Sequence, residues 1–395
     1  LTLGLQGGLA QSEDYVLAQV YQRLLADART ELTYPAYLAG LTYGLSVSAS
    51  GFELRLAGYD DKQPQLLAEV LENFTALPLN ADKFALYRAE LMREWGNFDR
   101  ERPYTQTVAS IGHLLIDGRW PPAELAAALE GKSVADLEQW RKRRLAGITV
   151  NGLVHGNANA NTAEIMAELV AKHLPLADFP LHKAAIRNVV EPLQLELPID
   201  HQDASLALYI QDPDSSYATR ARSALAVQLV RQAYFTALRT EQQLGYVVAL
   251  SSRSLLDRGG LTFIVQSPVA GPAQLQQATR RFLVAQIDAV QAMDNAQFEQ
   301  SKAGLIARLT ERDKNLGQRS ARYWADLQLG ITQFDSAQQI AQHAAEIGKP
   351  EIVAFLRSAV DKLDSQSLVI FNRGKFAALP EQGKTISDIA KFKRG

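Results

Sequence analysis

Cysteine is absent from the 395-residue sequence, and three kinds of chemistry are excluded with it. Without thiols the chain forms no disulfides, offers no thiolate ligand to a metal and has no cysteine nucleophile. The absence leaves the redox compartment undetermined. Long apolar runs are also missing: the longest apolar stretch is far too short to cross a bilayer. We therefore expect a soluble protein with no membrane partner.

A strong charge of either sign is lacking as well. The formal net charge is −2 and the basic residues are scattered, apart from one short run at residues 141–144. This run ends a predicted helix, where cations cap the C-terminus, so we expect no nucleic-acid partner. Apolar residues make up 47% of the chain and charged residues 21%, a globular balance, and the length favours two domains.

The histidines lack the spacing of a hydrolytic zinc site, which needs two imidazoles on one helix face and a carboxylate near the bound water. No two histidines are three or four residues apart, and neither HxxEH nor HExxH occurs. The nearest miss is His343 with Glu346, after which Ile347 and Gly348 stand where a second histidine is required. We therefore predict no metal ligands among the six histidines, His113, His155, His173, His182, His201 and His343.

What is present is one pattern of elements that occurs twice. The first copy begins with a strand, a long helix and a hairpin, and the same order returns from Ser205. LTYGLSV at Leu41 matches LGYVVAL at Leu244, and GFELRLAG at Gly51 matches GLTFIVQS at Gly260. The offset of about 200 to 220 residues is far longer than a solenoid repeat, so the pattern indicates duplicated domains.

Each copy mixes hairpin strands with runs of consecutive helices, which favours an α+β fold with helices on one face of a mainly antiparallel sheet. We place the first domain at residues 1–175 and the second at residues 201–375. Residues 176–200 contain three prolines and little helical periodicity, and are predicted to be a linker. Residues 376–395 are polar and basic, and are predicted to be a surface tail.

The segment RTEQQLGYVVALSS, residues 239–252, lies where a long predicted helix meets the second hairpin. In a purely structural interpretation, Arg239 is a cation at a helix C-terminus and Tyr246 is a strand aromatic. In a functional interpretation, both side chains point into a cavity and donate to a peptide carbonyl. Two such donors hold a developing oxyanion, and losing one typically lowers the rate about 100-fold to 1,000-fold. They do not start hydrolysis without a metal-bound water.

The same segment resembles one in the last domain of the pitrilysin/insulysin family of zinc metallopeptidases, whose pattern is LRTxxQLGY. Residues 238–246 of this chain, LRTEQQLGY, match every defined position. GLTFIVQS and a helix entering RYW at Arg322 agree with the family too. Residues 34–64, YPAYLAGLTYGLSVSASGFELRLAGYDDKQP, resemble its third domain. The resemblance covers nearly the whole chain in the family's domain order.

The resemblance implies two tandem metallopeptidase-like domains that form the C-terminal half of a peptidase. The family's zinc motif lies in the N-terminal half, so we expect zinc in the intact protein, bound by that half, and none in this segment. The Arg and Tyr of LRTxxQLGY reach the substrate backbone, which gives Arg239 and Tyr246 the role of substrate-carbonyl and transition-state contacts. In the first copy Tyr43 lies fourteen residues after Arg29 rather than seven, so the role is not transferred to that pair.

The function that the resemblance implies is that of a non-catalytic half, which forms chamber wall and contacts peptide substrates of a zinc metalloendopeptidase. Its partner is the N-terminal catalytic half, and this segment alone is expected to be inactive. Two alternatives stay open: the peptide-processing protease of pyrroloquinoline quinone biosynthesis, and a non-catalytic scaffold subunit whose zinc motif is lost. Resemblance to bacterial members favours a periplasmic location. Because the first residue is Leu1, we expect the natural N-terminus to be missing.

Overall fold

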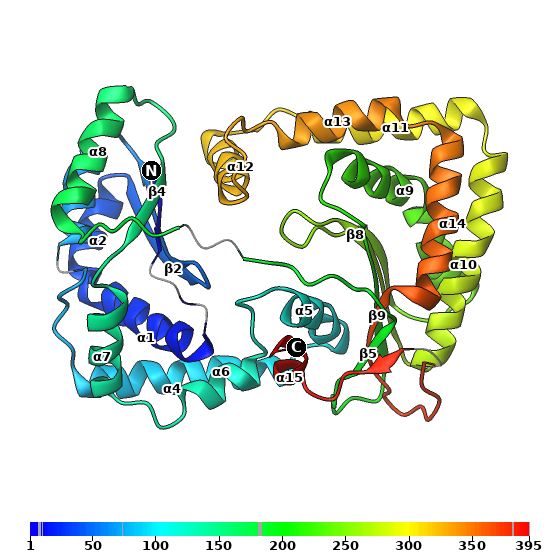
Figure 1. Cartoon of the computed structure of the whole chain (residues 1–395), viewed down its shortest axis with the longest axis horizontal. Coiled ribbons are helices and arrows are strands. Elements are labelled where there is room, and N and C mark those ends of the chain that lie inside the picture. The colour runs from blue at the N-terminus through cyan, green and yellow to red at the C-terminus, as the bar shows by residue number, and fades with distance from the viewer. Residues whose placement is uncertain (7–8, 10, 73, 181–183, 381–382, 395) are drawn as a thin grey trace. The chain divides into compact units, whose positions relative to one another are not determined.

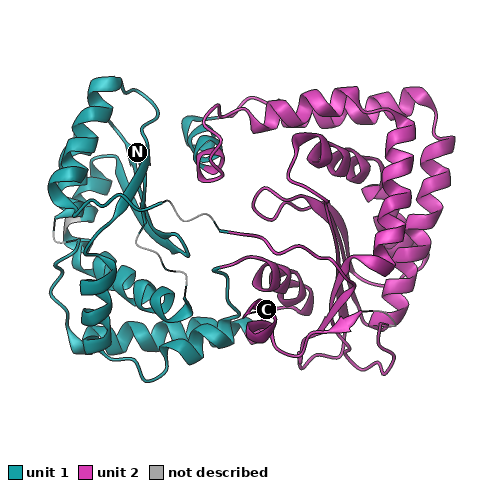
Figure 2. Cartoon of the chain, viewed as in Figure 1, with its two compact units in different colours: residues 1–98, 118–184, 315–324 teal, residues 99–117, 185–314, 325–395 magenta. Residues whose placement is uncertain are grey.

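The computed structural model describes residues 1–6, 9, 11–72, 74–180, 184–380 and 383–394. They form two compact units (Figure 2). Unit 1 comprises residues 1–98, 118–184 and 315–324, and unit 2 comprises residues 99–117, 185–314 and 325–395. Unit 1 thus includes residues 315–324 from the second half of the sequence, and unit 2 includes residues 99–117 from the first half. The two predicted domains contain no such exchanged segments. None of the helices in the described ranges is long and apolar enough to span a membrane.

Unit 1 is built on a four-stranded sheet with the strand order β2-β3-β1-β4, in which every pair is antiparallel. Its strands are β1 (Thr2–Gln6), β2 (Leu41–Ser48), β3 (Gly51–Gly58) and β4 (Thr149–Leu153). The predicted hairpin is confirmed, with Ser48 opposite Gly51. A Cβ on Gly51 would lie 2.2 Å from the Leu5 carbonyl oxygen, and its φ of +140° also favours glycine.

The described part of unit 1 has seven α-helices beside this sheet. They are α1 (Ser12–Ala28), α2 (Thr30–Leu38), α3 (Gln63–Leu71), α4 (Ala81–Asn97), α6 (Pro122–Leu129), α7 (Val134–Arg144) and α8 (Ala160–His173); the 3₁₀ helix η1 (Phe98–Arg100) follows α4. Helix α1 buries residues at spacings of three and four, among them Val20, Tyr21 and Leu24. Tyr21 packs edge-on or tilted against Phe52 and Trp140 in the core.

The basic run at the end of α7 has structural partners within unit 1. Arg143 and Arg144 both pair with Asp14, a carboxylate that is only 4% exposed. Arg141 donates to the Leu77 carbonyl oxygen. Three of the four cations are therefore used to stabilise the packing of α7 against neighbouring segments.

Unit 2 is built on a six-stranded sheet with the strand order β10-β5-β9-β6-β8-β7. Its strands are β5 (Leu193–Glu196), β6 (Ala204–Gln211), β7 (Val247–Ser252), β8 (Gly260–Ser267), β9 (Ser367–Asn372) and β10 (Lys384–Thr385). The four strands of the repeated pattern are antiparallel, whereas β5 and β10 add in parallel. Strand β5 comes from the predicted linker, and β10 and helix α15 (Ile389–Arg394) come from the predicted tail.

Helices cover both faces of the unit 2 sheet. They are α5 (Pro103–Leu115), α9 (Tyr217–Phe235), α10 (Pro272–Ala292), α11 (Asn295–Leu309), α13 (Ser336–Glu346), α14 (Lys349–Ser365) and α15, while α12 (Leu316–Gln328) has residues in both units. Helices α10 and α14 lie on one side of the sheet and α5 on the other (Figure 1).

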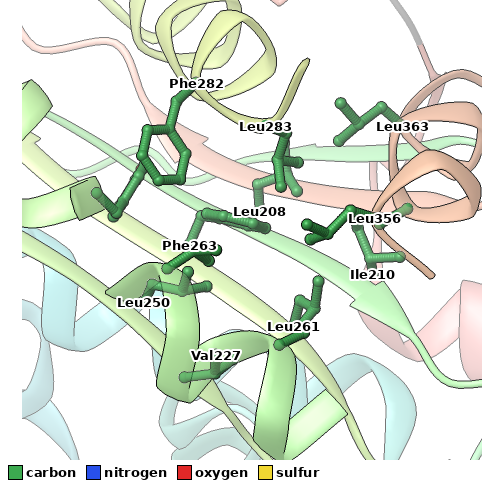
Figure 3. Packing of buried hydrophobic residues seen from close by; sticks show 14 of the residues in the cluster. Leu208, Ile210, Val227, Leu250, Leu261, Phe263, Phe282, Leu283, Leu356 and Leu363 are labelled. Carbon is green, nitrogen blue, oxygen red and sulfur yellow. The ribbon is translucent and has the colours of Figure 1, made fainter. Parts of the chain in front are cut away.

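The main core of unit 2 lies between the sheet and helices α9, α10 and α14. Leu208 and Phe263 of the sheet pack there near Phe282 and Leu356 (Figure 3). Every residue of β6 is buried, which accounts for a strand that is apolar at nearly every position. The predicted α+β fold with a mainly antiparallel sheet is confirmed, and α5 adds a helix on the second face of the sheet.

Candidate functional site

The segment that carries Arg239 begins with an irregular helix end. Helix α9 ends at Phe235, and the chain continues as one π-helical turn, η2 (Thr236–Glu241). The sequence predicts a regular helix up to this corner and has no local pattern for the π-helical turn. π-turns are rare and are frequent at functional sites.

Two buried leucines hold the corner that follows. Leu238 and Leu244 are 0% and 7% exposed, and the Leu244 N–H donates to the Leu238 carbonyl oxygen at 2.8 Å. Between them Gln243 has a φ of 51°, a left-handed conformation that is uncommon for a residue other than glycine. The buried pair therefore fixes the turn that leads from η2 toward β7.

Gly245 brings the chain into contact with strand β8. A Cβ at this position would lie 2.2 Å from the Gln266 carbonyl oxygen, so only glycine fits the close approach. The next residue, Tyr246, is thereby placed beside Gln266. The three residues of LGY therefore have to be consecutive. Leu244 is buried in the core, Gly245 allows the close approach to β8, and Tyr246 follows directly beside Gln266.

The Tyr246 phenol is 46% exposed and belongs to a three-membered hydrogen-bond network. Its hydroxyl donates to Asp203 Oδ2 at 3.0 Å. Gln266 Nε2 donates to the same carboxylate oxygen at 3.0 Å and to the Tyr246 hydroxyl at 2.5 Å. Asp203 immediately precedes β6, and Gln266 is a fully buried residue of β8. The network thus joins the Tyr246 phenol to strand β8 and to the residue just before β6.

The charge state of Tyr246 follows from these neighbours. Partial burial and, after it, the hydrogen bond and negative charge of Asp203 raise the pKa of Tyr246 above its ordinary value, against a smaller opposing effect of Arg102. The phenol therefore stays protonated at neutral pH and is able to donate a hydrogen bond.

Arg239 is exposed, and its guanidinium lies over the Phe235 ring, 5.0 Å from the ring centroid. Stacking uses the face of the guanidinium, whereas its five N–H donors lie in the plane, so the stack restrains the side chain without occupying the donors. Arg239 and Tyr246 thus have different neighbours. Both side chains are exposed at the surface of unit 2.

The corresponding pair of the first copy is arranged differently. Arg29 is 6% exposed and donates to the Glu72 carbonyl oxygen inside unit 1. Burial raises the pKa of Tyr43 to about 12, although the charge of Arg29 opposes the rise. This pair is internal to unit 1 and does not present two donors at the surface.

Two of the described histidines, His155 and His343, lie beside polar or charged side chains. His155 Nδ1 lies 2.8 Å from Ser320 Oγ, and His343, whose side chain is 41% exposed, lies 4.0 Å from Glu346. His182 falls outside the described residues. Within the described ranges, no group of three or more His, Asp or Glu side chains is placed to hold a metal ion. The described residues therefore do not fit the zinc that the resemblance assigns to the intact protein.

Sequence reasoning proposed Arg239 and Tyr246 and did not predict that Asp203 and Gln266 contact Tyr246. Gln266 stands in the quoted stretch GLTFIVQS, where a buried amide follows a run of apolar residues. A buried polar side chain in such a strand needs a hydrogen-bond partner. The glutamine at the end of GLTFIVQS was therefore the available sign that this position takes part in a hydrogen-bond network.

Two family models match the chain, in order along the sequence. Residues 5–128 match the model described as the middle or third domain of peptidase M16. Residues 225–324, which include Arg239 and Tyr246, match the model described as PQQ synthase PqqF-like, C-terminal lobe domain 4.

Curated relatives extend the similarity over most of the chain. Insulin-degrading enzyme-like 1, peroxisomal, from Arabidopsis thaliana is 29% identical over 358 residues, which cover 86% of this chain and 36% of that protein. Human insulin-degrading enzyme is 26% identical over 414 residues, which cover 96% of this chain and 40% of that protein. The chain thus spans well under half the length of these relatives.

Solved structures show the same fold. The crystal structure of pitrilysin superposes with a TM-score of 0.87 and 18% sequence identity, over 100% of this chain and 43% of that one. At this identity the likeness establishes the fold and no residue role.

Proposed function

Because the chain belongs to the pitrilysin/insulysin family of M16 metallopeptidases and corresponds to its C-terminal half, we propose that it is the non-catalytic half of a zinc metalloendopeptidase. In this role it forms part of the wall of a peptide-binding chamber and contacts the substrate. The observation that carries the proposal is the corner at residues 238–246, where the chain presents Arg239 and a protonated Tyr246.

The two donors supply binding rather than bond cleavage. A guanidinium and a neutral phenol both donate hydrogen bonds and are suited to a peptide carbonyl, whose oxygen gains negative charge in the transition state. Neither group activates water. Zinc and the groups that do so belong, in this proposal, to the N-terminal half, which is the main partner of this chain.

The first test uses the full-length gene product. Arg239→Ala and Tyr246→Phe are expected to lower kcat/KM on a peptide substrate by about 100-fold each, with unchanged zinc content and unchanged folding. The controls are Arg231→Ala, which removes an exposed arginine of α9, and Tyr59→Phe, which alters a 75% exposed tyrosine of unit 1. Wild-type turnover in both site variants would show that the segment makes no substrate contact.

A second candidate is favoured by the match of residues 225–324 to the PqqF-like domain. In this candidate the intact protein processes the precursor peptide of pyrroloquinoline quinone. Cleavage of that precursor, in preference to unrelated peptides of similar length, identifies it. If the full-length product has no HxxEH and only activates a separate catalytic chain, the protein is a scaffold subunit and both peptidase candidates fail.

A further inference from the structure

We infer that Asp203 and Gln266 are positioning residues that hold the Tyr246 phenol in its donor orientation. The inference rests on the proposed function, in which Tyr246 donates to a substrate carbonyl. It adds two residues from outside the motif, Asp203 just before β6 and Gln266 in β8, which contact Tyr246 and not the substrate.

An exposed tyrosine ordinarily samples several side-chain orientations, and ordering it lowers the entropy of the side chain. Tyr246 is 46% exposed and yet has two hydrogen-bond partners from outside its own segment. Asp203 accepts its proton, and Gln266 donates to its oxygen. The phenol oxygen is therefore located by groups in β8 and just before β6 rather than only by the loop that carries it.

The orientation of the Gln266 amide is set by a third element. The amide is fully buried, and its Oε1 accepts from the Tyr104 N–H in the first turn of α5 at 3.2 Å. With Oε1 occupied in this way, the two N–H groups face Asp203 and Tyr246. A flipped amide would place Oε1 against the Asp203 carboxylate and Nε2 against another donor, so the observed orientation is the favourable one.

Asp203 is fixed through its backbone. Its carbonyl oxygen accepts from Asn372 Nδ2 at 2.9 Å, at the end of β9. Gly374 approaches so closely that a Cβ there would lie 2.5 Å from the Asp203 carbonyl carbon, and its φ is +56°. The carboxylate that receives the Tyr246 proton is thus attached to a rigid corner of the sheet.

The network also tunes the phenol as a donor. A hydroxyl that accepts a hydrogen bond, as Tyr246 does from Gln266, is polarised and donates more strongly. Among the charged and titratable groups that face it, Asp203 and Tyr104 raise the pKa of Tyr246 and Arg102 lowers it, while partial burial contributes the largest rise.

A substrate carbonyl and Asp203 compete for the single phenolic proton. When Tyr246 turns its proton to a substrate, Asp203 still accepts from Gln266, so the carboxylate is not left without a partner. The exchange therefore avoids leaving the Asp203 charge without a hydrogen-bond partner, which costs more than the loss of a neutral hydrogen bond.

The direct test is the titration of Tyr246 in the 395-residue chain. Ring-labelled ¹³C tyrosine is observed by NMR, and Tyr246 is identified from the signal that Tyr246→Phe removes. We expect Asp203→Asn to lower the pKa of Tyr246 toward its ordinary value. Asp361→Asn, which removes an exposed carboxylate of α14, is the control and is expected to leave the titration unchanged. An identical Tyr246 titration in wild type and Asp203→Asn overturns the inference.

The second test is kinetic and uses the full-length enzyme. Gln266→Met keeps the side-chain size but removes the amide, and we expect kcat to fall about 10-fold to 100-fold through misplacement of the donor, with a smaller change in KM. Gln297→Met on the exposed face of α11 is the matched control. Wild-type kcat in a folded Gln266→Met enzyme contradicts the inference if Tyr246→Phe is impaired.

The two tests separate the inference from the function on which it rests. If Asp203→Asn shifts the titration but Tyr246→Phe retains full turnover, the positioning network is real and the proposed substrate contact fails. If Tyr246→Phe is impaired but neither network variant alters titration or kcat, the substrate contact stands and the positioning role fails.

Discussion

Gly245 passes so near Gln266 that a Cβ on the glycine would lie 2.2 Å from the Gln266 carbonyl oxygen. This one approach connects the LRTxxQLGY corner to strand β8 and determines where the Tyr246 phenol meets Asp203. The glycine of the motif is therefore required by backbone geometry, and the tyrosine that follows is the residue whose position depends on it.

Gly245→Ala is expected to destabilise unit 2 by about 1–3 kcal/mol, because the clashing atom belongs to a strand backbone and moves only with the sheet. Chemical denaturation measures the change. Gly44→Ala in β2 is the matched control, since a Cβ there meets nothing within 4 Å. If the two variants are equally stable, the close approach at Gly245 is not present in solution.

Local sequence determined much of this fold. Helix α4 at Ala81–Asn97 follows from local signals, because its apolar spacing and the Asn80 cap, which accepts from the Lys83 N–H, are both read from neighbouring residues. The π-turn at Thr236–Glu241 and the assignment of α5 to unit 2 depend on tertiary packing and were not predictable in this way. The same holds for the site: Arg239 and Tyr246 lie in one motif, whereas Asp203 and Gln266 are joined to Tyr246 only by the sheet.

Asp212 is expected to make stability depend on pH. Burial raises its pKa to about 6 against a smaller lowering by the Ser223 hydroxyl, and its Oδ2 has no hydrogen-bond partner. Because the folded pKa lies above the unfolded value of 3.8, the folded state binds the proton more tightly. This contribution to stability is fully present below about 3.8 and is lost as the pH rises through about 6.

Asp212→Asn removes this titration and keeps an acceptor for Ser223. Between about pH 3.8 and pH 6, the unfolding free energy of wild type is expected to lose the contribution of Asp212. The change in unfolding free energy across this range should therefore be about 3 kcal/mol less favourable in wild type than in Asp212→Asn. Urea denaturation at a series of pH values measures it. Asp361→Asn, on the exposed surface, serves as the control. Parallel curves for wild type and Asp212→Asn would contradict the assignment.

Asp14 is expected to stabilise unit 1 by pairing with the basic residues at the end of α7. It is 4% exposed and accepts from both Arg143 and Arg144. Asp14→Asn removes the negative charge while the two cations remain, so we expect unit 1 to lose about 1–3 kcal/mol. Glu13→Gln changes the exposed neighbouring carboxylate and is expected to alter stability by less than about 0.5 kcal/mol. Equal losses in the two variants would count against a specific role of Asp14.

The 395-residue chain is expected to retain no stoichiometric zinc after dialysis and to cleave no peptide. The physical reason is the ligand set: within the described ranges no three His, Asp or Glu side chains converge on one point, and a hydrolytic zinc needs three protein ligands and a bound water. Metal analysis after exposure to excess zinc measures the first expectation, and incubation of the zinc-treated chain with fluorogenic peptides measures the second. The matched control is the full-length product, in which the proposed function requires both zinc and turnover. Cleavage by the pure chain that a chelator abolishes would mean that these residues assemble a metal centre, and the division of labour between the two halves would then be wrong.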